Sequence, residues 1–191
     1  QEAGGVVRHD AVAWGFARAA SKAGIHIFQN CPATGIITQN GKLQAIDTPQ
    51  GRIACGQALI SVAGASCEVA GLAGLDLPLN SINVQAFVTE PVKPALDAVV
   101  NYNAGLSYVS QTDKGEFVLG GATDGYSSFA RRGSFERIED VLARAAQMFP
   151  FLPRLRLMRH WSGTADIPMD GNAIMGPTPI NGLMINGGWG Y

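Results

Sequence analysis

The sequence contains few charged residues and no excess of either sign. Charged side chains make up 15% of the 191 residues, whereas about 25% is usual for a globular chain. The 14 Lys and Arg residues nearly balance the 15 Asp and Glu residues, which gives a formal net charge of −1. This balance excludes the basic surface with which proteins bind nucleic acid or an anionic membrane. Because 47% of the residues are hydrophobic, intrinsic disorder is also excluded.

Cysteine and histidine are scarce as well. Cys31, Cys55 and Cys67 have no CxxC spacing and no histidine nearby, which argues against a disulfide framework and against a structural zinc site. We therefore predict no bound metal and three reduced thiols in a cytoplasmic protein. No apolar run approaches the roughly 20 residues of a membrane span, and the first residues do not have the pattern of a signal peptide.

The common ligand-binding motifs are missing, but glycine is abundant. The sequence has no HExxH, no P-loop and no GxGxxG, so none of these motifs points to a metal or a nucleotide. Glycine accounts for 24 residues, about 13% of the chain against a usual 7%. This excess predicts tight turns or places where the backbone approaches a ligand. The chain begins at Gln1 rather than Met and stops at Tyr191 within a glycine cluster, and we expect both ends to be cut.

The pattern of the first 80 residues predicts one helix followed by short strands. The helix spans residues 10–23, with Asp10 as its cap and Val12 and Phe16 on its apolar face. Asn40 and Gly41 are typical of a two-residue hairpin turn. The continuous apolar run at 58–62 favours a central strand covered on both faces. The predicted strands of this part are 25–28, 35–39, 42–48, 52–55 and 58–62.

The remaining residues predict a second group of strands around one further helix. Residues 137–149 have helical periodicity, and Pro150 and Pro153 end that helix. The strand-like segments are 84–90, 106–111, 116–120, 156–161 and 183–186. Pro91 and Pro94 indicate a linker or a sheet edge. Helices and strands that alternate in this way predict a mixed α/β protein (α+β).

Several short segments resemble one family of flavoenzymes. They are residues 4–10 (GGVVRHD), 13–18 (AWGFAR), 29–31 (QNC), 62–65 (VAGA), 108–111 (YVSQ), 114–116 (KGE) and 187–190 (GGWG). With the order of the elements, they make the chain resemble the D-amino-acid-oxidase-like FAD-dependent oxidoreductases, most closely the β subunits of heterotetrameric sarcosine oxidases. The resemblance implies part of a doubly wound FAD-binding domain at 1–79, a mixed-sheet substrate domain at 80–165, and a return segment at 166–191.

The resemblance also implies a reaction, two cofactors and partner subunits. Such enzymes oxidise N-methylglycine with noncovalent FAD and pass electrons through a covalent FMN to oxygen. By motif, His9 is the residue that carries FMN, at the interface with an α subunit. Arg8 stands where the family often has lysine, and a cation there would stabilise negative charge on reduced FMN. The other partners implied are the smaller subunits of the heterotetramer.

The resemblance assigns further residues to FAD and to the substrate. Tyr108 matches an active-site tyrosine of the related monomeric oxidases, and Thr34 matches a strand edge near the adenine. Small residues are expected where the backbone approaches the cofactor. The residues matched to FAD by this reasoning are Val62, Ala63, Gly64, Ala65 and Ser66 in one segment and Gly188, Trp189 and Gly190 in the other.

The chain departs from the family pattern at both ends. The opening GxGxxG segment, which holds the FAD pyrophosphate, is absent from these residues, and so is the tail expected after residue 190. We therefore expect the 191 residues alone to bind FAD weakly or not at all and to be inactive. Two other interpretations stay open: another amine or imino-acid oxidase or dehydrogenase of the same superfamily without FMN, and a non-catalytic α/β interaction domain.

Overall fold

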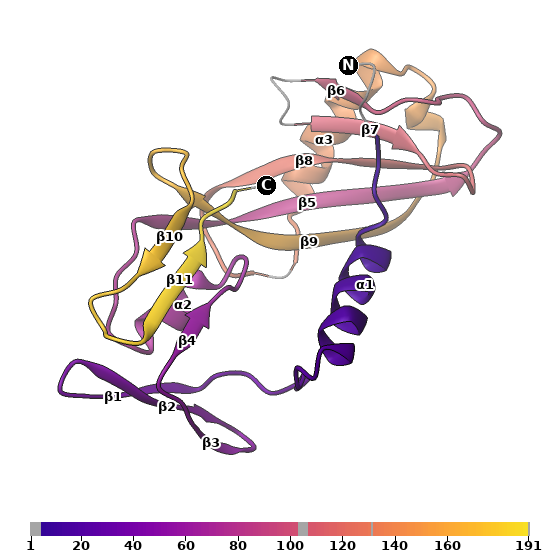
Figure 1. The fold of residues 1–191 in the computed structure, drawn as a ribbon. Coiled ribbons are helices and arrows are strands. Elements are labelled where there is room, and N and C mark those ends of the chain that lie inside the picture. The colour runs from indigo at the N-terminus through magenta and orange to yellow at the C-terminus, as the bar shows by residue number, and fades with distance from the viewer. Residues whose placement is uncertain (1–4, 103–106, 131, 191) are drawn as a thin grey trace.

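The computed structural model describes residues 5–102, 107–130 and 132–190. Its strands form three sheets, and Figure 1 labels the helices and strands along the chain. The predicted mixed α/β class is confirmed. The bounds are α1 His9–Lys22, β1 Gly35–Gln39, β2 Lys42–Thr48, β3 Gly51–Ala54, β4 Ala58–Ile60, α2 Ser66–Gly71, β5 Leu79–Pro91, β6 Val100–Tyr102, β7 Ser107–Gln111, β8 Glu116–Ser127, α3 Phe135–Met148, β9 Leu157–Pro168, β10 Ile174–Pro177 and β11 Leu183–Gly187, with a 3-10 turn at Leu152–Arg154.

The first sheet is the predicted antiparallel meander, β1-β2-β3. Asn40 and Gly41 connect β1 to β2 with φ angles of 51° and 72°. Two consecutive residues with positive φ match the right-handed twist of a hairpin, which confirms the turn read from the sequence. Ile36 and Leu43 turn inward from this sheet and join the core of its neighbour.

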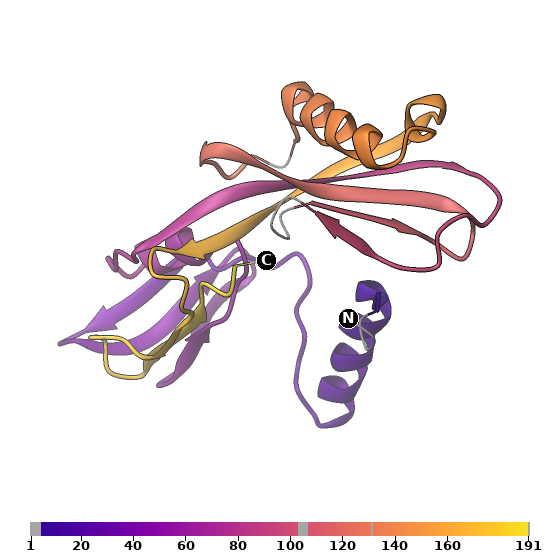
Figure 2. The same cartoon turned by 90° about the horizontal axis from the view of Figure 1, so that it is seen from above.

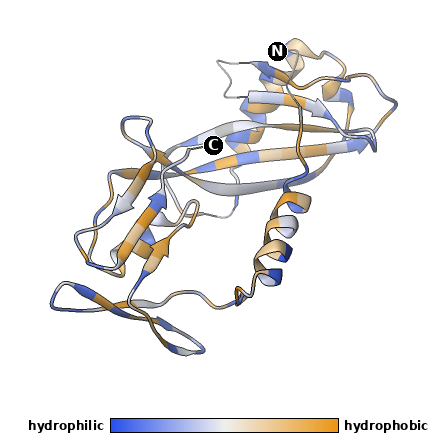
Figure 3. Ribbon diagram, viewed as in Figure 1, coloured by the Kyte–Doolittle hydropathy of each residue, from blue (hydrophilic) through white to orange (hydrophobic). Residues whose placement is uncertain are grey.

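The second sheet, β10-β11-β4, contains the segment predicted as a central strand. β4 pairs in parallel with β11, and β11 pairs antiparallel with β10. In the described part of the chain β4 is an edge strand and not a central one, and 55% of the Leu59 side chain is exposed. The prediction of a strand covered on both faces is therefore wrong here, because only the Ile60 face is packed. Strands β4 and β11 are rich in hydrophobic residues, as Figure 3 shows.

The third sheet is antiparallel and has the strand order β6-β7-β8-β5-β9. Helix α3 covers one of its faces, and Figure 2 shows this helix and α1 on opposite sides of the sheet. The buried side chains between α3 and the sheet are Phe87, Val109, Phe117, Leu119, Val141 and Ala145. Since successive side chains of a strand alternate between faces, Ala86, Tyr108 and Gly120 belong to the face that α3 leaves free.

Helix α1 differs from its prediction in its cap and in its packing. Arg8 is the N-cap and makes no side-chain capping bond, whereas Asp10 lies in the first turn and pairs with Arg8. The apolar face is not covered: Phe16 is 74% exposed, and none of the residues of α1 is buried. The strand predicted at 25–28 is also wrong, because Ile25 and Phe28 are exposed in a segment that has no neighbouring strand in the described structure.

The five strands predicted in the second half are confirmed, and four of them are longer than predicted. The segment predicted at 84–90 is part of the 13-residue β5, and the one predicted at 156–161 begins the 12-residue β9. Residue 106, the predicted start of the next strand, lies outside the described residues. β9 continues across residues 165 and 166, where a domain boundary was expected. The division into segments 1–79, 80–165 and 166–191 stays a prediction. Among the described helices, none is both long enough and apolar enough to cross a membrane.

Candidate functional site

Two of the segments matched to FAD lie side by side in the structure. One follows β4 and the other follows β11, and because these strands are parallel neighbours, both segments leave the sheet at the same edge. Together with one residue of β9 they surround a cavity of about 150 Å³. The lining residues are Ser61, Val62, Ala63, Asp166, Asn186, Gly187, Gly188, Trp189 and Gly190.

Glycine is required at two positions of these segments. Gly64 has a φ of +77°, and a Cβ at this residue would lie 2.3 Å from the carbonyl oxygen of Thr164. Gly188 has a φ of +73°, and its Cβ would lie 2.8 Å from Cδ2 of Leu79. At Gly64 the positive φ and the contact with backbone both exclude larger residues. At Gly188 the positive φ is the main constraint, because the Leu79 side chain is able to shift. The two segments are packed tightly against β9 and against the start of β5.

A buried aspartate joins the two segments through its side chain and its backbone. Asp166 is 3% exposed, and its Oδ2 accepts hydrogen bonds from the backbone N–H groups of Gly64 and Ser66 at 3.0 and 3.2 Å. Its Oδ1 accepts a hydrogen bond from the Ser81 hydroxyl at 3.0 Å. The backbone carbonyl of Asp166 accepts a further bond from the N–H of Gly190 at 3.0 Å. One residue of β9 thus contacts the loop after β4, strand β5 and the segment after β11.

A second set of polar contacts connects the rim of the cavity. The indole N–H of Trp189 donates to Oδ1 of Asn186 at 2.8 Å, and the amide of Asn186 donates to the Ser61 hydroxyl at 3.3 Å. Trp189 itself is 66% exposed. The side chain of Trp189 is therefore oriented by a hydrogen bond while its ring stays open to contact another molecule.

The five matched residues of the first segment have different environments. Val62 and Ala63 line the cavity, and Ala65 is partly exposed. Gly64 and Ser66 are buried, and the Ser66 hydroxyl donates to the carbonyl of Val62 at 2.6 Å. Since the N–H groups of Gly64 and Ser66 already bond to Asp166, the small side chains at 62 and 63 are what this segment presents to the cavity.

Tyr108 lies in the middle of the large sheet, on the face that α3 leaves free. It pairs with Gly120 of β8, Gly120 pairs with Ala86 of β5, and Ala86 pairs with Trp161 of β9. Two aromatic residues therefore flank two small ones in a row across four strands. Burial raises the pKa of the Tyr108 phenol above its ordinary value, so the hydroxyl is protonated at neutral pH. Tyr108 is not among the residues that line the 150 Å³ cavity.

The remaining matched residues lie away from this cavity. His9 is the first residue of α1 and is exposed, and the Arg8 guanidinium beside it donates to the Asp10 carboxylate at 2.6 Å. The hydrogen bond from Arg8 lowers the pKa of Asp10. Thr34 is exposed and precedes β1, where its N–H donates to the carbonyl of Asp47. The structure thus brings together residues 62–63 and 188–190 but not His9, Thr34 and Tyr108.

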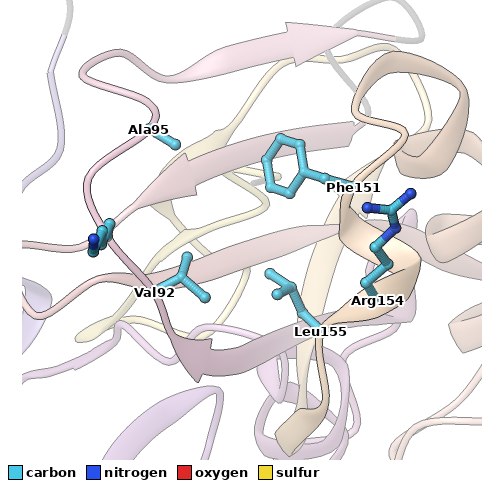
Figure 4. Close-up of a pocket in the computed structure, with 6 residues that line it drawn as sticks. Val92, Ala95, Phe151, Arg154 and Leu155 are labelled. Atoms are coloured by element: carbon cyan, nitrogen blue, oxygen red, sulfur yellow. The ribbon is translucent and has the colours of Figure 1, made fainter.

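A larger, open hollow lies elsewhere on the molecule. It has a volume of about 500 Å³ and is almost entirely apolar. Figure 4 shows Phe151, Leu155 and Val92 around it, with Arg154 at one side. None of the residues matched to a cofactor or substrate lines this hollow. Nor do the described residues contain a group of three or more His, Cys, Asp or Glu side chains that could hold a metal ion.

Comparison with known proteins identifies the family. The family model described as FAD dependent oxidoreductase matches residues 1–191. The chain belongs to this family. Over its whole length it is 48% identical to the sarcosine oxidase subunit beta of Rhizobium meliloti and, over 190 residues, 45% identical to that of Rhodobacter capsulatus. It covers 46% of each of these two proteins, so the chain spans about half the length of the curated relatives it matches.

Solved structures of two other proteins share the fold. An L-proline dehydrogenase from P. horikoshii and a glycine oxidase from Geobacillus kaustophilus each superpose with a TM-score of 0.81 at 22% sequence identity. Each comparison covers 94% of this chain and 49% and 48% of the solved chains, respectively. At this identity the likeness establishes the fold, and the mixed α/β architecture expected from the sequence is confirmed.

The residues around the cavity fit an FAD site in part. Sites for small molecules and cofactors usually enclose about 300–1,000 Å³, and the cavity here has about 150 Å³. Part of its wall consists of small side chains and of glycine backbone with positive φ, a surface that a flat ring system can approach closely. Asp166, Asn186 and Trp189 also line the cavity. The described residues are therefore compatible with one wall of an FAD site, and they do not form a complete enclosure.

Four of the residues that line the cavity were missed by the sequence analysis: Ser61, Asp166, Asn186 and Gly187. Asp166 follows a strand-like segment and carries no motif, so nothing in the local sequence distinguishes it from a surface aspartate. Asn186 ends a predicted strand next to the glycine cluster. Polarity at the end of an apolar strand was the one available signal for Asn186, because ligand sites of α/β sheets lie at the carboxyl ends of strands. This signal does not apply to Asp166, which lies inside the antiparallel strand β9.

Proposed function

We propose that this chain is part of the β subunit of a sarcosine oxidase, which oxidises N-methylglycine with FAD. The observation that carries the proposal is an identity of 45–48% to two sarcosine oxidase β subunits over the whole chain. The segments matched to FAD by motif also line one cavity, which supports the assignment of Val62, Ala63 and Gly188–Gly190 to the cofactor. When bound, FAD would accept the hydride equivalent that leaves the carbon next to the amine nitrogen as the C–N single bond becomes an imine.

Tyr108 is proposed to contact the substrate. Its phenol is half-buried on the open face of the sheet, and its raised pKa keeps the hydroxyl protonated. A protonated phenol can donate a hydrogen bond to a substrate carboxylate but does not act as a base at neutral pH. Tyr108 therefore has the properties of a group that binds and orients an amino acid. We expect that amino acid to be oxidised at the flavin, beside the residues matched to FAD.

His9 is proposed to carry a covalent FMN, with Arg8 next to it. The imidazole is exposed at the start of α1, so it is accessible for bond formation with a flavin methyl carbon. The aromatic and aliphatic residues exposed on the same helix, including Trp14 and Phe16, are suited to burial against another part of the enzyme. We propose that this helix lies at the interface with an α subunit of a heterotetramer, to which smaller subunits also belong.

The experiment is peptide mapping of the assembled enzyme. The full-length subunit is produced with its partner subunits, digested and analysed by mass spectrometry for an FMN adduct on the peptide that contains His9. His9→Ala is expected to remove the adduct while N-methylglycine still reduces FAD. The matched control is His26→Ala, a second exposed histidine, which should retain the adduct. An enzyme without any adduct on His9 contradicts the FMN assignment.

The substrate is tested separately with a panel of amines. Anaerobic reduction of FAD is followed with N-methylglycine, N,N-dimethylglycine, proline and glycine. N-methylglycine is expected to give the highest kcat/KM. Preference for proline or glycine, without an adduct on His9, would favour the alternative of another amine or imino-acid oxidase or dehydrogenase. A full-length protein that contains no flavin and reduces none would favour a non-catalytic interaction domain.

A further inference from the structure

Asp166 has an environment that is unusual for a carboxylate. It is almost completely buried, yet among the described residues it forms no ion pair. Burial of a charge without a cation is unfavourable unless hydrogen-bond donors replace the lost water. Here the donors are the N–H groups of Gly64 and Ser66 and the hydroxyl of Ser81. Hydrogen bonds to a carboxylate are stronger than those between neutral groups.

The partners of Asp166 belong to segments that are distant in the sequence. Gly64 and Ser66 precede it by about 100 residues, and Ser81 by 85. The N–H of Gly190, in the segment after β11, donates to its backbone carbonyl. Asp166 is also the register partner of Ser81 in the pairing of β9 with β5. The position of this carboxylate is therefore determined by a sheet, and the carboxylate in turn determines the path of the 64–66 loop.

We propose that Asp166 is a positioning residue for FAD. It holds the 64–66 loop against β9 so that Val62 and Ala63 form one wall of the cavity, and through its backbone it anchors the opposite wall at Gly190. Its hydrogen bonds also occupy two N–H groups of the loop, which leaves an apolar surface at 62–63. The effect on FAD rests on the proposed function. The effect on the two segments does not.

Three variants of the full-length subunit separate this role from general stability. Asp166→Ala removes all three side-chain hydrogen bonds. Asp166→Asn keeps an oxygen that can accept from Gly64 and Ser66, and its amide can donate to the Ser81 hydroxyl, which is able to accept. Ser81→Ala leaves both bonds to the loop in place and is the matched control.

The first readout is backbone hydrogen exchange of the FAD-free protein, followed by mass spectrometry. In Asp166→Ala, exchange of peptides covering 62–66 should accelerate at least tenfold, while peptides of α3 and β8 stay unchanged. Peptides covering 188–190 should change less, because the bond from Gly190 goes to the backbone carbonyl of residue 166, which alanine keeps. Asp166→Asn should restore exchange to within about threefold of the unsubstituted protein, and Ser81→Ala should leave the loop protected. Unchanged exchange at 62–66 in Asp166→Ala, or faster exchange throughout the chain, would overturn the proposal.

The second readout is the dissociation constant of FAD. Asp166→Ala should raise it at least tenfold, equivalent to about 1.4 kcal/mol, and Asp166→Asn should raise it less than about threefold. If the unsubstituted protein itself binds no FAD, the proposed function fails while the exchange measurement still tests the positioning role. If FAD affinity is the same in Asp166→Ala as in the unsubstituted protein, the positioning of FAD is refuted.

Discussion

The environment of a single side chain, Tyr108, makes the stability of the protein dependent on pH. Burial raises the pKa of Tyr108 in the folded state above the value of about 10 for an unfolded chain. The folded state therefore holds the phenolic proton more tightly than the unfolded state does. The resulting stability is fully present below about pH 10 and is lost as the pH rises through the folded pKa. Each unit of difference corresponds to about 1.4 kcal/mol.

We predict that the free energy of unfolding of the full-length subunit falls above about pH 10 and that Tyr108→Phe reduces this decline. Denaturant titrations at several alkaline pH values provide the measurement. Tyr102→Phe is the positive control, because the pKa of Tyr102 is also raised by burial and contributes to the decline in the same direction. Tyr126→Phe is the negative control because Tyr126 is 65% exposed. An identical decline in Tyr108→Phe and in the unsubstituted protein would refute the prediction.

Single residues were predictable from the sequence where the backbone itself imposes the choice. Asn40 and Gly41 were identified as a turn because few residues adopt positive φ, and the structure contains that turn. Asp166 was not identified, because its importance arises from donors about 85 to 100 residues away. A residue whose role depends on long-range contacts has no local signal in one sequence.

Strand pairing, at the scale of the element, explains why Gly120 stands opposite Tyr108. A Cβ on Gly120 would lie 2.7 Å from two ring carbons of Tyr108 and 2.7 Å from its hydroxyl oxygen. Gly120 therefore allows the ring to lie across the sheet. We predict that Gly120→Ala displaces the ring and destabilises the full-length subunit by about 1–3 kcal/mol, the usual cost of overpacking. If Tyr108 binds substrate, the KM for N-methylglycine should also rise.

The matched control for Gly120→Ala is Gly163→Ala on the same face of the sheet. Gly163 pairs with Val84 of β5, two residues from Ala86, and a Cβ at this glycine would have no neighbour within 4 Å. Gly163→Ala should change stability by less than about 0.5 kcal/mol. Addition of Tyr108→Ala to Gly120→Ala should recover part of the loss, as a double-mutant cycle measures. Equal effects of the two glycine substitutions would contradict the proposed contact.

The full length of β5 could not be predicted because several of its buried side chains are polar. Ser81, Asn83 and Gln85 occupy alternate positions of β5 and are all buried. Each has a distant partner: Ser81 bonds to Asp166, the Asn83 amide donates to the carbonyl of Ala130, and Gln85 bonds to Ser134. Oδ1 of Asn83 has no partner among the described residues. An alternation of apolar and polar residues assumes that polar residues face water, and it fails when hydrogen bonds allow their burial.

Whole-molecule packing explains the two predictions of the first half that were wrong. Residues 25–28 and 58–62 are apolar enough for buried strands, and helix α1 has an apolar face. In the described structure these surfaces are exposed, with Phe28 at 63%, Leu59 at 55% and Trp14 at 59%. The sequence indicated the surfaces that require cover, but burial also depends on what packs against them. The curated relatives are about twice as long as the chain, and we propose that their additional residues supply this cover.

The same packing argument predicts how the 191 residues behave alone. The cavity between residues 62–63 and 188–190 has about 150 Å³, less than the 300–1,000 Å³ usual for a ligand site, and the sequence contains no GxGxxG to hold a pyrophosphate. We therefore predict that a polypeptide of these residues binds FAD at least 100-fold more weakly than the full-length subunit and does not oxidise N-methylglycine.

By linkage, FAD at 100 times the Kd of the full-length subunit should stabilise that subunit by about 2.7 kcal/mol. The same FAD concentration should leave the unfolding of the shorter chain nearly unchanged, because there it is no more than about equal to the Kd. Comparable stabilisation of both proteins in parallel denaturant titrations would mean that the described residues suffice for FAD binding.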